Sequence, residues 1–275
     1  MTQISTTDVS KLRKLTGAGI MNCKKALQES EGNFEKAIEI IRKKGQAIAN
    51  KRTDREASEG VCIAKVNKDN TFGAIIALNC ETDFVAKNEN FVKFAFSILD
   101  VAITNKPSDL EALKQLDLNG KSISDTIVEQ IGVIGEKIDL VHYYKIEAAQ
   151  VVPYIHHGNR LSTLVGLNKT VNIEIGKDVA MQVAAMNPIS IDKDDVPATI
   201  IEQEKEMGRE QARKEGKPEN LVDKIAEGKL NKYFKENTLL NQEFTKDNKK
   251  TIRQFLQEVD KALTVTAFNR YSVFI

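Results

Sequence analysis

The segment Asn79-Cys80-Glu81-Thr82-Asp83-Phe84-Val85-Ala86-Lys87-Asn88 connects two elements that the amino-acid pattern predicts strongly. Before it, residues 61–66 and 72–78 are mostly apolar and flank the turn residues Lys68-Asp69-Asn70, a pattern that predicts a β-hairpin. After it, apolar side chains recur at helical spacing and predict an amphipathic helix: Phe91, Phe94, Ala95, Ile98 and Ala102. A hairpin followed by a helix predicts an α+β fold for this part of the chain.

Within this connection an acidic residue, Asp83, stands beside a large aromatic one, Phe84. A phenylalanine at a corner between loop and helix is either a plug in the core or a probe that enters another protein. The plug is the commoner case, and the residues alone leave both interpretations open.

Composition narrows the class of protein. The 275 residues are enough for two or three compact units, and 41% of them are hydrophobic. The net charge is only +1, which argues against a dedicated nucleic-acid binder because phosphate contacts need a basic excess. No apolar run reaches the roughly 20 residues that span a bilayer, and residues 1–10 lack the apolar stretch of a secretory signal. We therefore expect a cytoplasmic protein without a membrane partner, which also suits its three widely spaced cysteines.

Residues 7–45 predict three short helices separated by turns at Thr16–Gly19 and Glu31–Asn33. Gly45 is expected to end the third helix. The positions predicted to face inward are Val9, Leu12, Leu15, Cys23, Ala26, Leu27, Phe34, Ala37, Ile38 and Ile41. A bundle this small has a thin core. We therefore interpret residues 1–55 as a docking module.

Two features of this module allow more than one interpretation. Ile20 and Met21 follow the glycine-containing break and are either core residues of the second helix or an exposed contact for a partner. The basic stretch from Arg42 to Arg55 is either a nucleic-acid arm or a solvated linker, and its lack of interleaved aromatic residues favours the linker.

Beyond the first hairpin, strands and helices alternate again. The predicted elements are a helix over Ile123–Ile134, strands over Ile138–Ala149 and Leu161–Leu167 with a turn at His156–Arg160 between them, a helix over Asp178–Met186 and a last strand over Leu263–Ile275. We therefore expect two α+β subdomains with small antiparallel sheets, residues 56–140 and 141–275.

Residues 198–235 differ in character from the body. Glu202–Lys217 is almost entirely polar, with a favourable pair at Glu210 and Lys214, and Gly216-Lys217-Pro218 breaks it. An amphipathic helix follows, marked by Leu221, Val222, Ile225, Ala226, Leu230, Tyr233 and Phe234. The pattern predicts an antiparallel helical arm inserted before the last strand, which buries too little alone and is expected to self-associate or contact a second partner.

Enzyme chemistry finds little support in the sequence. Gly120-Lys121-Ser122 lacks the upstream glycine of a phosphate-binding loop, and Gly17-Ala18-Gly19 lacks the third glycine of a dinucleotide fingerprint. The histidines His142, His156 and His157 have no neighbouring cysteine or carboxylate that completes a metal site. We expect no catalytic residue, no cofactor and no metal, although a small-molecule enzyme with a site between the subdomains remains an alternative.

Four stretches resemble the elongation factor Ts family, the nucleotide-exchange factors of bacterial translation. They are the Thr-Asp-Phe-Val-Ala signature at 82–86, the N-terminal signature Leu12–Leu27, the His-Gly-X-Arg turn within Tyr154–Leu161 and the helix Met181–Pro188. They follow the family's order and spacing over nearly the whole chain. The resemblance implies a UBA-like N-terminal bundle and a coiled-coil insertion at the helical arm.

The resemblance also implies a function. The protein would bind the GTPase elongation factor Tu and expel its GDP, with Asp83 and Phe84 entering the partner near its magnesium site. The exchange residues implied are Thr82, Asp83, Phe84, Val85, Ile134 and His157. The docking residues implied are Arg13, Ile20, Met21 and Lys24. An RNA-binding protein that uses Arg42–Arg55 remains a second alternative, and the near-neutral net charge speaks against it.

Overall fold

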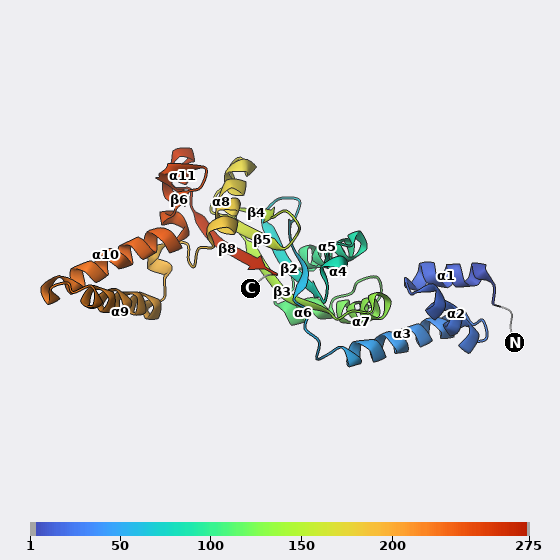
Figure 1. The fold of residues 1–275 in the computed structure, drawn as a ribbon. Coiled ribbons are helices and arrows are strands. Elements are labelled where there is room, and N and C mark those ends of the chain that lie inside the picture. Colours follow the sequence, from blue (N-terminus) through green and yellow to red (C-terminus); the bar gives the residue numbers. More distant parts are fainter. Residues whose placement is uncertain (1–3, 274–275) are drawn as a thin grey trace.

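A computed structural model describes residues 4–273 of the chain. Three helices lie at one end of an elongated molecule, small antiparallel sheets lie in the middle, and a pair of long helices projects at the other end (Figure 1). This arrangement confirms the predicted α+β class, the N-terminal bundle and the inserted arm. Among the described residues, no helix is long and apolar enough to cross a membrane.

The N-terminal bundle consists of α1 (Thr6–Thr16), α2 (Ile20–Glu29) and α3 (Phe34–Lys51). Asn33 caps α3 by accepting a hydrogen bond from the N–H of Lys36 at 3.0 Å. The buried residues of the bundle are few, as the sequence predicts: Val9, Leu12, Ala18, Cys23, Ala26, Leu27 and Ala37. Leu15, predicted to join them, is 64% exposed instead, because α1 ends one residue later and no element packs over that position.

The expectation that Gly45 ends the third helix is wrong, because α3 continues to Lys51. Gly45 is buried against Gly132 of α7 (Ile123–Ile134), where the two helices approach backbone to backbone. Glycine there serves close packing between helices. As a consequence, much of the basic stretch from Arg42 onward is helix and not linker.

The first sheet has the order β1-β2-β3, with β1 (Glu59–Val66), β2 (Phe72–Cys80) and β3 (Ile138–Glu147) all antiparallel. β1 and β2 form the predicted hairpin. One face of the sheet is covered by α5 (Glu89–Asn105) and α7, and the short helices α4 (Asp83–Ala86) and α6 (Leu110–Gln115) pack at its edges. The resulting core includes Phe72, Ile76, Leu78, Phe91, Ile98 and Leu140.

The second sheet has the order β4-β5-β8, with β4 (Gln150–Ile155), β5 (Leu161–Leu167) and β8 (Val265–Ser272). Its helix, α8 (Ile173–Met186), starts five positions before the predicted one because Asn172 caps it. The strand predicted over 138–149 was expected in this sheet, but β3 pairs with β2 and a bend at 148–149 redirects the chain into β4. The last strand returns to this sheet as predicted, and its expected end at residues 274–275 lies outside the described residues.

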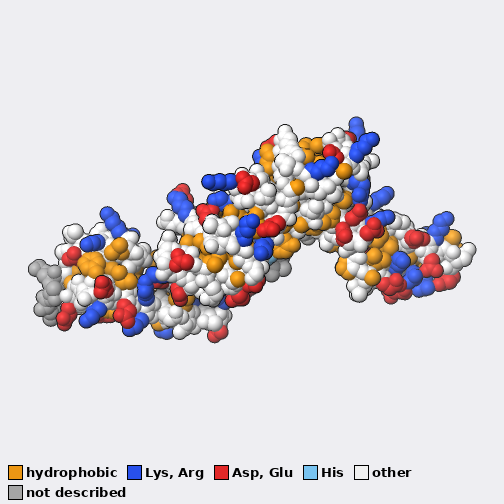
Figure 2. All heavy atoms as spheres, turned by 180° about the vertical axis from the view of Figure 1, so that it is seen from behind, with side chains coloured by type: hydrophobic (Ala, Val, Ile, Leu, Met, Phe, Trp, Pro, Cys, Tyr) orange, Lys and Arg blue, Asp and Glu red, His pale blue; other side chains and the backbone are white. Residues whose placement is uncertain are grey.

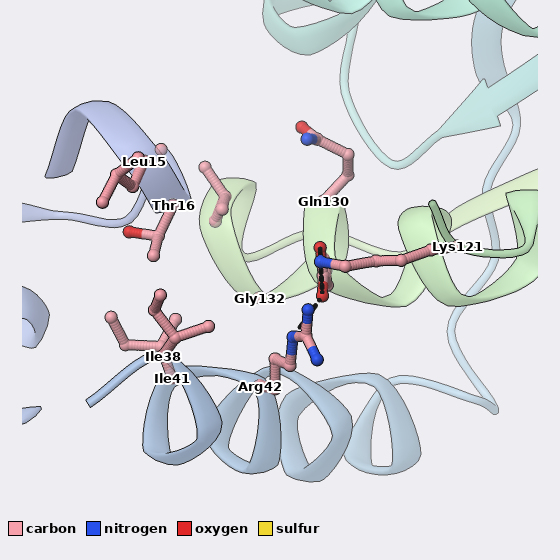
Figure 3. A pocket seen from close by; sticks show the side chains of 11 residues that line it. Leu15, Thr16, Ile38, Ile41, Arg42, Lys121, Gln130 and Gly132 are labelled. Carbon is pink, nitrogen blue, oxygen red and sulfur yellow. Dashed lines mark hydrogen bonds and ion pairs between the residues drawn. The ribbon is translucent and has the colours of Figure 1, made fainter. Parts of the chain in front are cut away.

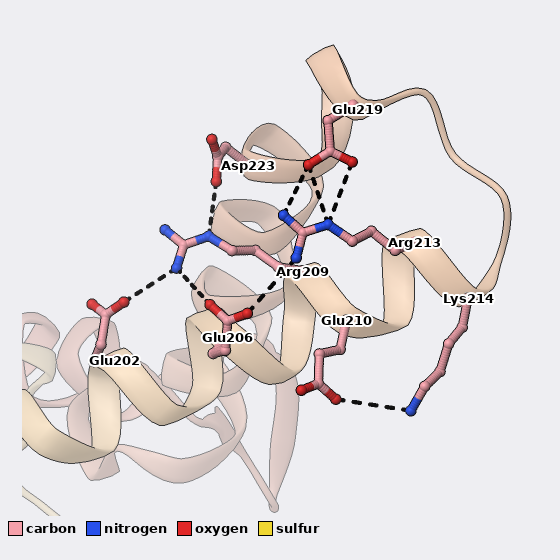
Figure 4. Close-up of polar contacts among 8 residues, drawn as sticks. All are labelled: Glu202, Glu206, Arg209, Glu210, Arg213, Lys214, Glu219 and Asp223. Carbon is pink, nitrogen blue, oxygen red and sulfur yellow. Dashed lines mark hydrogen bonds and ion pairs between the residues drawn. The ribbon is translucent and has the colours of Figure 1, made fainter.

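The arm consists of the antiparallel helices α9 (Ala198–Lys214) and α10 (Glu219–Asn237), inserted between α8 and β8 (Figure 1). Its seam is narrow because Gly208 lets α9 lie directly against Ala226 of α10. Charged side chains cover the outside: Arg209 contacts Glu202, Glu206 and Asp223, and Arg213 contacts Glu219 (Figure 4). Such exposed pairs add little stability.

Several short elements of the second half have no counterpart in the predictions. They are the 3-10 turns η1 (Lys193–Asp195) and η2 (Leu239–Asn241), the hairpin of β6 (Glu243–Phe244) and β7 (Asp247–Thr251), and α11 (Ile252–Val259). Together with α8 they enclose a second core that contains Val183, Leu239, Phe244 and Leu256.

Candidate partner-binding site

Phe84 lies on the single turn of α4, and 84% of the residue is exposed. A core plug would be buried, so the structure excludes that interpretation. Large exposed aromatic side chains on soluble proteins commonly mark interaction sites. Phe84 is therefore available to a partner without any change in the fold.

The rest of α4 is held against the body of the protein. Val85 packs against the first core and Ala86 is buried, so these two side chains point opposite to Phe84. The N–H of Ala86 donates to the carbonyl of Thr82 at 3.2 Å, and that of Lys87 donates to the carbonyl of Asp83 at 3.0 Å. The turn thus presents Asp83 and Phe84 from a fixed base.

Asp83 carries a charge beside the exposed ring. Its carboxylate accepts a hydrogen bond from the ammonium of Lys87 at 2.6 Å. This bond, with the guanidinium of Arg160 nearby, holds the pKa of the Asp83 carboxyl below its usual value. Asp83 is therefore an anion at neutral pH.

Thr82 joins this turn to the loop that follows α7. Its N–H donates to Oε2 of Glu136 at 3.0 Å and its hydroxyl donates to Oε1 of the same carboxylate at 2.7 Å. The Sγ of Cys80 lies 3.2 Å from the carbonyl of Thr82. Burial, reinforced by the Glu136 charge, raises the pKa of the Cys80 thiol to about 12, so it stays protonated and can donate this bond.

Glu81 links the same loop to the end of the N-terminal bundle. Its side chain is only 12% exposed and accepts bonds at 2.6 Å from both the N–H of Lys137 and the guanidinium of Arg52. Arg55 lies 3.5 Å from its second oxygen. Burial opposes ionisation of Glu81, but these donors outweigh it and lower its pKa below the usual value.

His157 lies exposed in the turn between β4 and β5, where Gly158 and Asn159 adopt positive φ angles of 87° and 57°. The turn is tied to β1, because the N–H of Cys62 donates to the carbonyl of Asn159 at 2.7 Å and Arg160 pairs with Glu59 at 2.5 Å. Arg160 also lowers the pKa of Asp83, so this turn lies within electrostatic reach of the turn at residues 82–86.

Ile134, the last residue of α7, is half-buried and packs against the first core. Together with Val85, Phe91 and Val133 it lines a shallow hollow beside α4. The structure thus brings Thr82, Asp83, Phe84, Val85 and Ile134 together. Glu81 and Glu136, which support this group, are not among the predicted site residues. Glu136 stands 54 positions from Thr82, and no local signal marks the contact.

The predicted docking residues lie apart from this group, on the N-terminal bundle. Arg13 and Lys24 are exposed, and Ile20 and Met21 are 54% and 62% exposed, so these two are surface residues and not core residues of α2. Leu15 adds a third exposed apolar side chain to the bundle.

A cavity of about 400 Å³ lies between the bundle and α7, beside the point where α3 and α7 are in contact (Figure 3). Leu15, Ile38 and Ile41 lie on its bundle side, and none of the predicted site residues lines it. At its other end Glu129 is already paired with Arg42 at 2.8 Å and with Lys121 at 2.5 Å. The cavity therefore offers no unpaired charge to a ligand.

The basic stretch is largely neutralised within the protein. Arg42 pairs with Glu129, Lys43 with Glu39, Lys44 with Glu29, and Arg52 and Arg55 with Glu81. Acidic and basic side chains are intermingled over the face seen in Figure 2. This pairing weakens the RNA-binding alternative. Within residues 4–273, no group of three or more His, Cys, Asp or Glu side chains is placed to hold a metal ion.

Comparison with known proteins agrees with the resemblance. A family model described as Elongation factor TS matches residues 81–274. Elongation factor Ts of Porphyromonas gingivalis is 52% identical over 267 residues, 97% of each chain. Those of Amoebophilus asiaticus and Christiangramia forsetii are 51% and 50% identical over 273 and 275 residues, covering 98% and 99% of this chain and 99% and 100% of their own. The chain belongs to the elongation factor Ts family of translation elongation factors.

Proposed function

We propose that this protein is a guanine-nucleotide exchange factor that binds elongation factor Tu and promotes release of its GDP, so that GTP can bind. The observation that carries this proposal is the exposed ring of Phe84 on a turn whose opposite side is anchored in the core. The protein acts by binding and performs no covalent chemistry. Its place of action is the cytoplasm, where translation elongation occurs.

The mechanism is a wedge. GDP is held largely through its phosphates and a magnesium ion of the GTPase. Phe84 inserts into the partner and separates the elements that support the ion, while the Asp83 carboxylate makes polar contacts beside it. Because coupling is reciprocal, a factor that weakens nucleotide binding is itself displaced by fresh nucleotide to the same degree.

Phe84 does not act alone in this proposal, because burial of one ring contributes too little for a large acceleration of exchange. Burying one phenylalanine contributes roughly 1.5–3 kcal/mol, or about ten- to a hundredfold in an equilibrium constant. Further contacts come from Val85 within residues 82–86, the exchange loop, and from Ile134 and His157 outside it. Residues 1–55 serve as a docking module through Arg13, Ile20, Met21 and Lys24.

The first subdomain, proposed over residues 56–140, carries the loop, and the second, over residues 141–275, carries the β4–β5 turn. β3 crosses this boundary because it pairs with β2 of the first sheet. The arm at about residues 198–235 is an accessory element for self-association or a secondary partner contact. Direct nucleic-acid binding and membrane contact play no part in this proposal.

The decisive experiment measures release of labelled GDP from elongation factor Tu with and without this protein. The proposal expects release to accelerate with protein concentration until it saturates. An unchanged rate at all concentrations would refute it.

A further inference from the structure

Thr82 occupies the N-cap position of α4 but does not cap it. A threonine at this position normally accepts a hydrogen bond from an N–H in the first turn, as Thr251 does for Gln254 at 3.2 Å. Thr82 makes no such side-chain bond to α4. Its hydroxyl instead donates to Glu136, and this bond joins the start of α4 to the loop that follows α7.

The contact with Glu136 fixes the main chain directly before the exposed pair Asp83 and Phe84. Each carboxylate oxygen of Glu136 accepts one bond from Thr82, at 2.7 Å from the hydroxyl and 3.0 Å from the N–H. The Thr82 carbonyl accepts hydrogen bonds from the N–H of Ala86 and the thiol of Cys80. All polar groups of Thr82 therefore have partners.

Glu136 is itself held in place. It follows Gly135, whose φ of 82° ends α7 in the left-handed conformation that favours glycine. It precedes Lys137, whose N–H donates to Glu81 and whose ammonium donates to the carbonyls of Thr53 and Arg55 at 2.8 and 2.9 Å. Residues 135–137 thus join the end of α3, the exchange loop and α7.

We propose that Glu136 is a positioning residue for nucleotide exchange: it orders the Thr82 main chain so that Phe84 is presented to the GTPase in one orientation. This inference rests on the proposed function. Glu136 acts on Phe84 indirectly, through its two hydrogen bonds with Thr82. An ordered probe loses less conformational freedom on binding than a mobile one, so removing the anchor slows exchange.

Three variants test the role of this contact. Glu136→Ala removes both acceptors, Thr82→Val removes the hydroxyl but keeps the side-chain shape, and Thr82→Ser retains the hydroxyl. GDP release from elongation factor Tu at subsaturating factor is expected to slow about tenfold for E136A and by at least threefold for T82V, as the loss of charge-assisted bonds predicts. T82S is expected to recover most of what T82V loses. Asp192→Asn, which disturbs a half-buried carboxylate paired with Arg253 in the second half, is the matched control and should exchange like the wild type.

A structural readout separates positioning from general damage. Hydrogen exchange at the Thr82 amide should quicken in E136A while the melting temperature and the protection of the β1–β2 hairpin stay near wild type. If wild-type protein fails to release GDP, the proposed function is wrong. If the wild type works and E136A releases GDP at the wild-type rate although hydrogen exchange at the Thr82 amide has quickened, the positioning role is overturned. Release of GDP by T82V at the wild-type rate would overturn it as well. Should E136A not fold, T82V against T82S decides alone, and equal rates for these two variants would count against the proposal.

Discussion

Gly45 of α3 and Gly132 of α7 meet with almost no space between their backbones: a Cβ built on Gly132 lies 2.5 Å from the Cα of Gly45. Real Cβ atoms essentially never come so close to a backbone carbon. This pair seats the N-terminal bundle on the body and sets the bundle's direction relative to the exchange loop.

Gly132→Ala is therefore expected to push α3 away from α7. The free energy of unfolding should fall by about 1–3 kcal/mol, as for other overpacked sites, in denaturant titrations followed by circular dichroism. Gly228→Ala on α10 is the matched control, because a Cβ there meets nothing within 4 Å. It should raise the stability of the arm by about 0.5–1 kcal/mol. A Gly132→Ala protein as stable as the wild type would show that the helices separate freely.

The exposed pair on α2 should contribute to partner affinity. Ile20→Ser combined with Met21→Ser is expected to weaken binding of elongation factor Tu in calorimetric titrations while the helical signal is retained, since neither side chain belongs to the bundle core. Val259→Ser, at an exposed position at the end of α11, is the control and should leave affinity unchanged. Unfolding of the bundle in the double variant would contradict this assignment.

The arm should be dispensable for folding. Replacing residues 199–235 with a short Gly/Ser linker leaves the buried residues Leu239 and Leu240 and the sheet pairing of β8 in place. The melting temperature of the remaining protein should stay close to that of the full chain, and GDP release should be largely intact. Failure of the shortened chain to fold would show that the helices belong to the core.

Glu81 should make the link between α3 and the exchange loop sensitive to acid. Its folded-state pKa is lowered, so its contribution to stability is present above the ordinary carboxyl pKa of 4.5 and is lost as the pH falls through the folded value. Glu81→Gln should cost about 1–3 kcal/mol of unfolding free energy at pH 7 and markedly less near pH 3. Glu89→Gln, at a side chain 88% exposed, should change stability little at either pH. An equal loss for Glu81→Gln at both pH values would exclude an ionised role.

The parts of the fold that could be predicted from sequence are those set by local periodicity. The β1–β2 hairpin, α5 and the arm carry apolar stripes and turn residues that need no distant partner to interpret. The prediction that Gly45 ends α3 is wrong because a glycine that permits close helix packing has the same sequence signal as one that ends a helix. β3 was expected in the second sheet because an apolar run does not reveal which neighbour it pairs with.

The site could be predicted only in part, for the same reason. The motif at 82–86 and its resemblance to a family located the exchange loop, but the exposure of Phe84 depends on what packs around α4. The hydrogen bonds between Thr82 and Glu136 join residues 54 positions apart, and no sequence pattern near either residue predicts them. Leu15 continues the stripe of Val9 and Leu12, yet it is exposed because the bundle has no element to cover it.

The wedge mechanism is tested most directly by Phe84→Ala, measured by thermal melting and by GDP release from elongation factor Tu on the same preparation. Because Phe84 is 84% exposed, the substitution opens no core cavity, and the melting temperature should barely change while GDP release slows by about tenfold or more. Phe91→Ala, at a residue 2% exposed, is the contrast and should cost about 3–5 kcal/mol of stability. A strongly lowered melting temperature for Phe84→Ala, with release per folded molecule unchanged, would contradict the account.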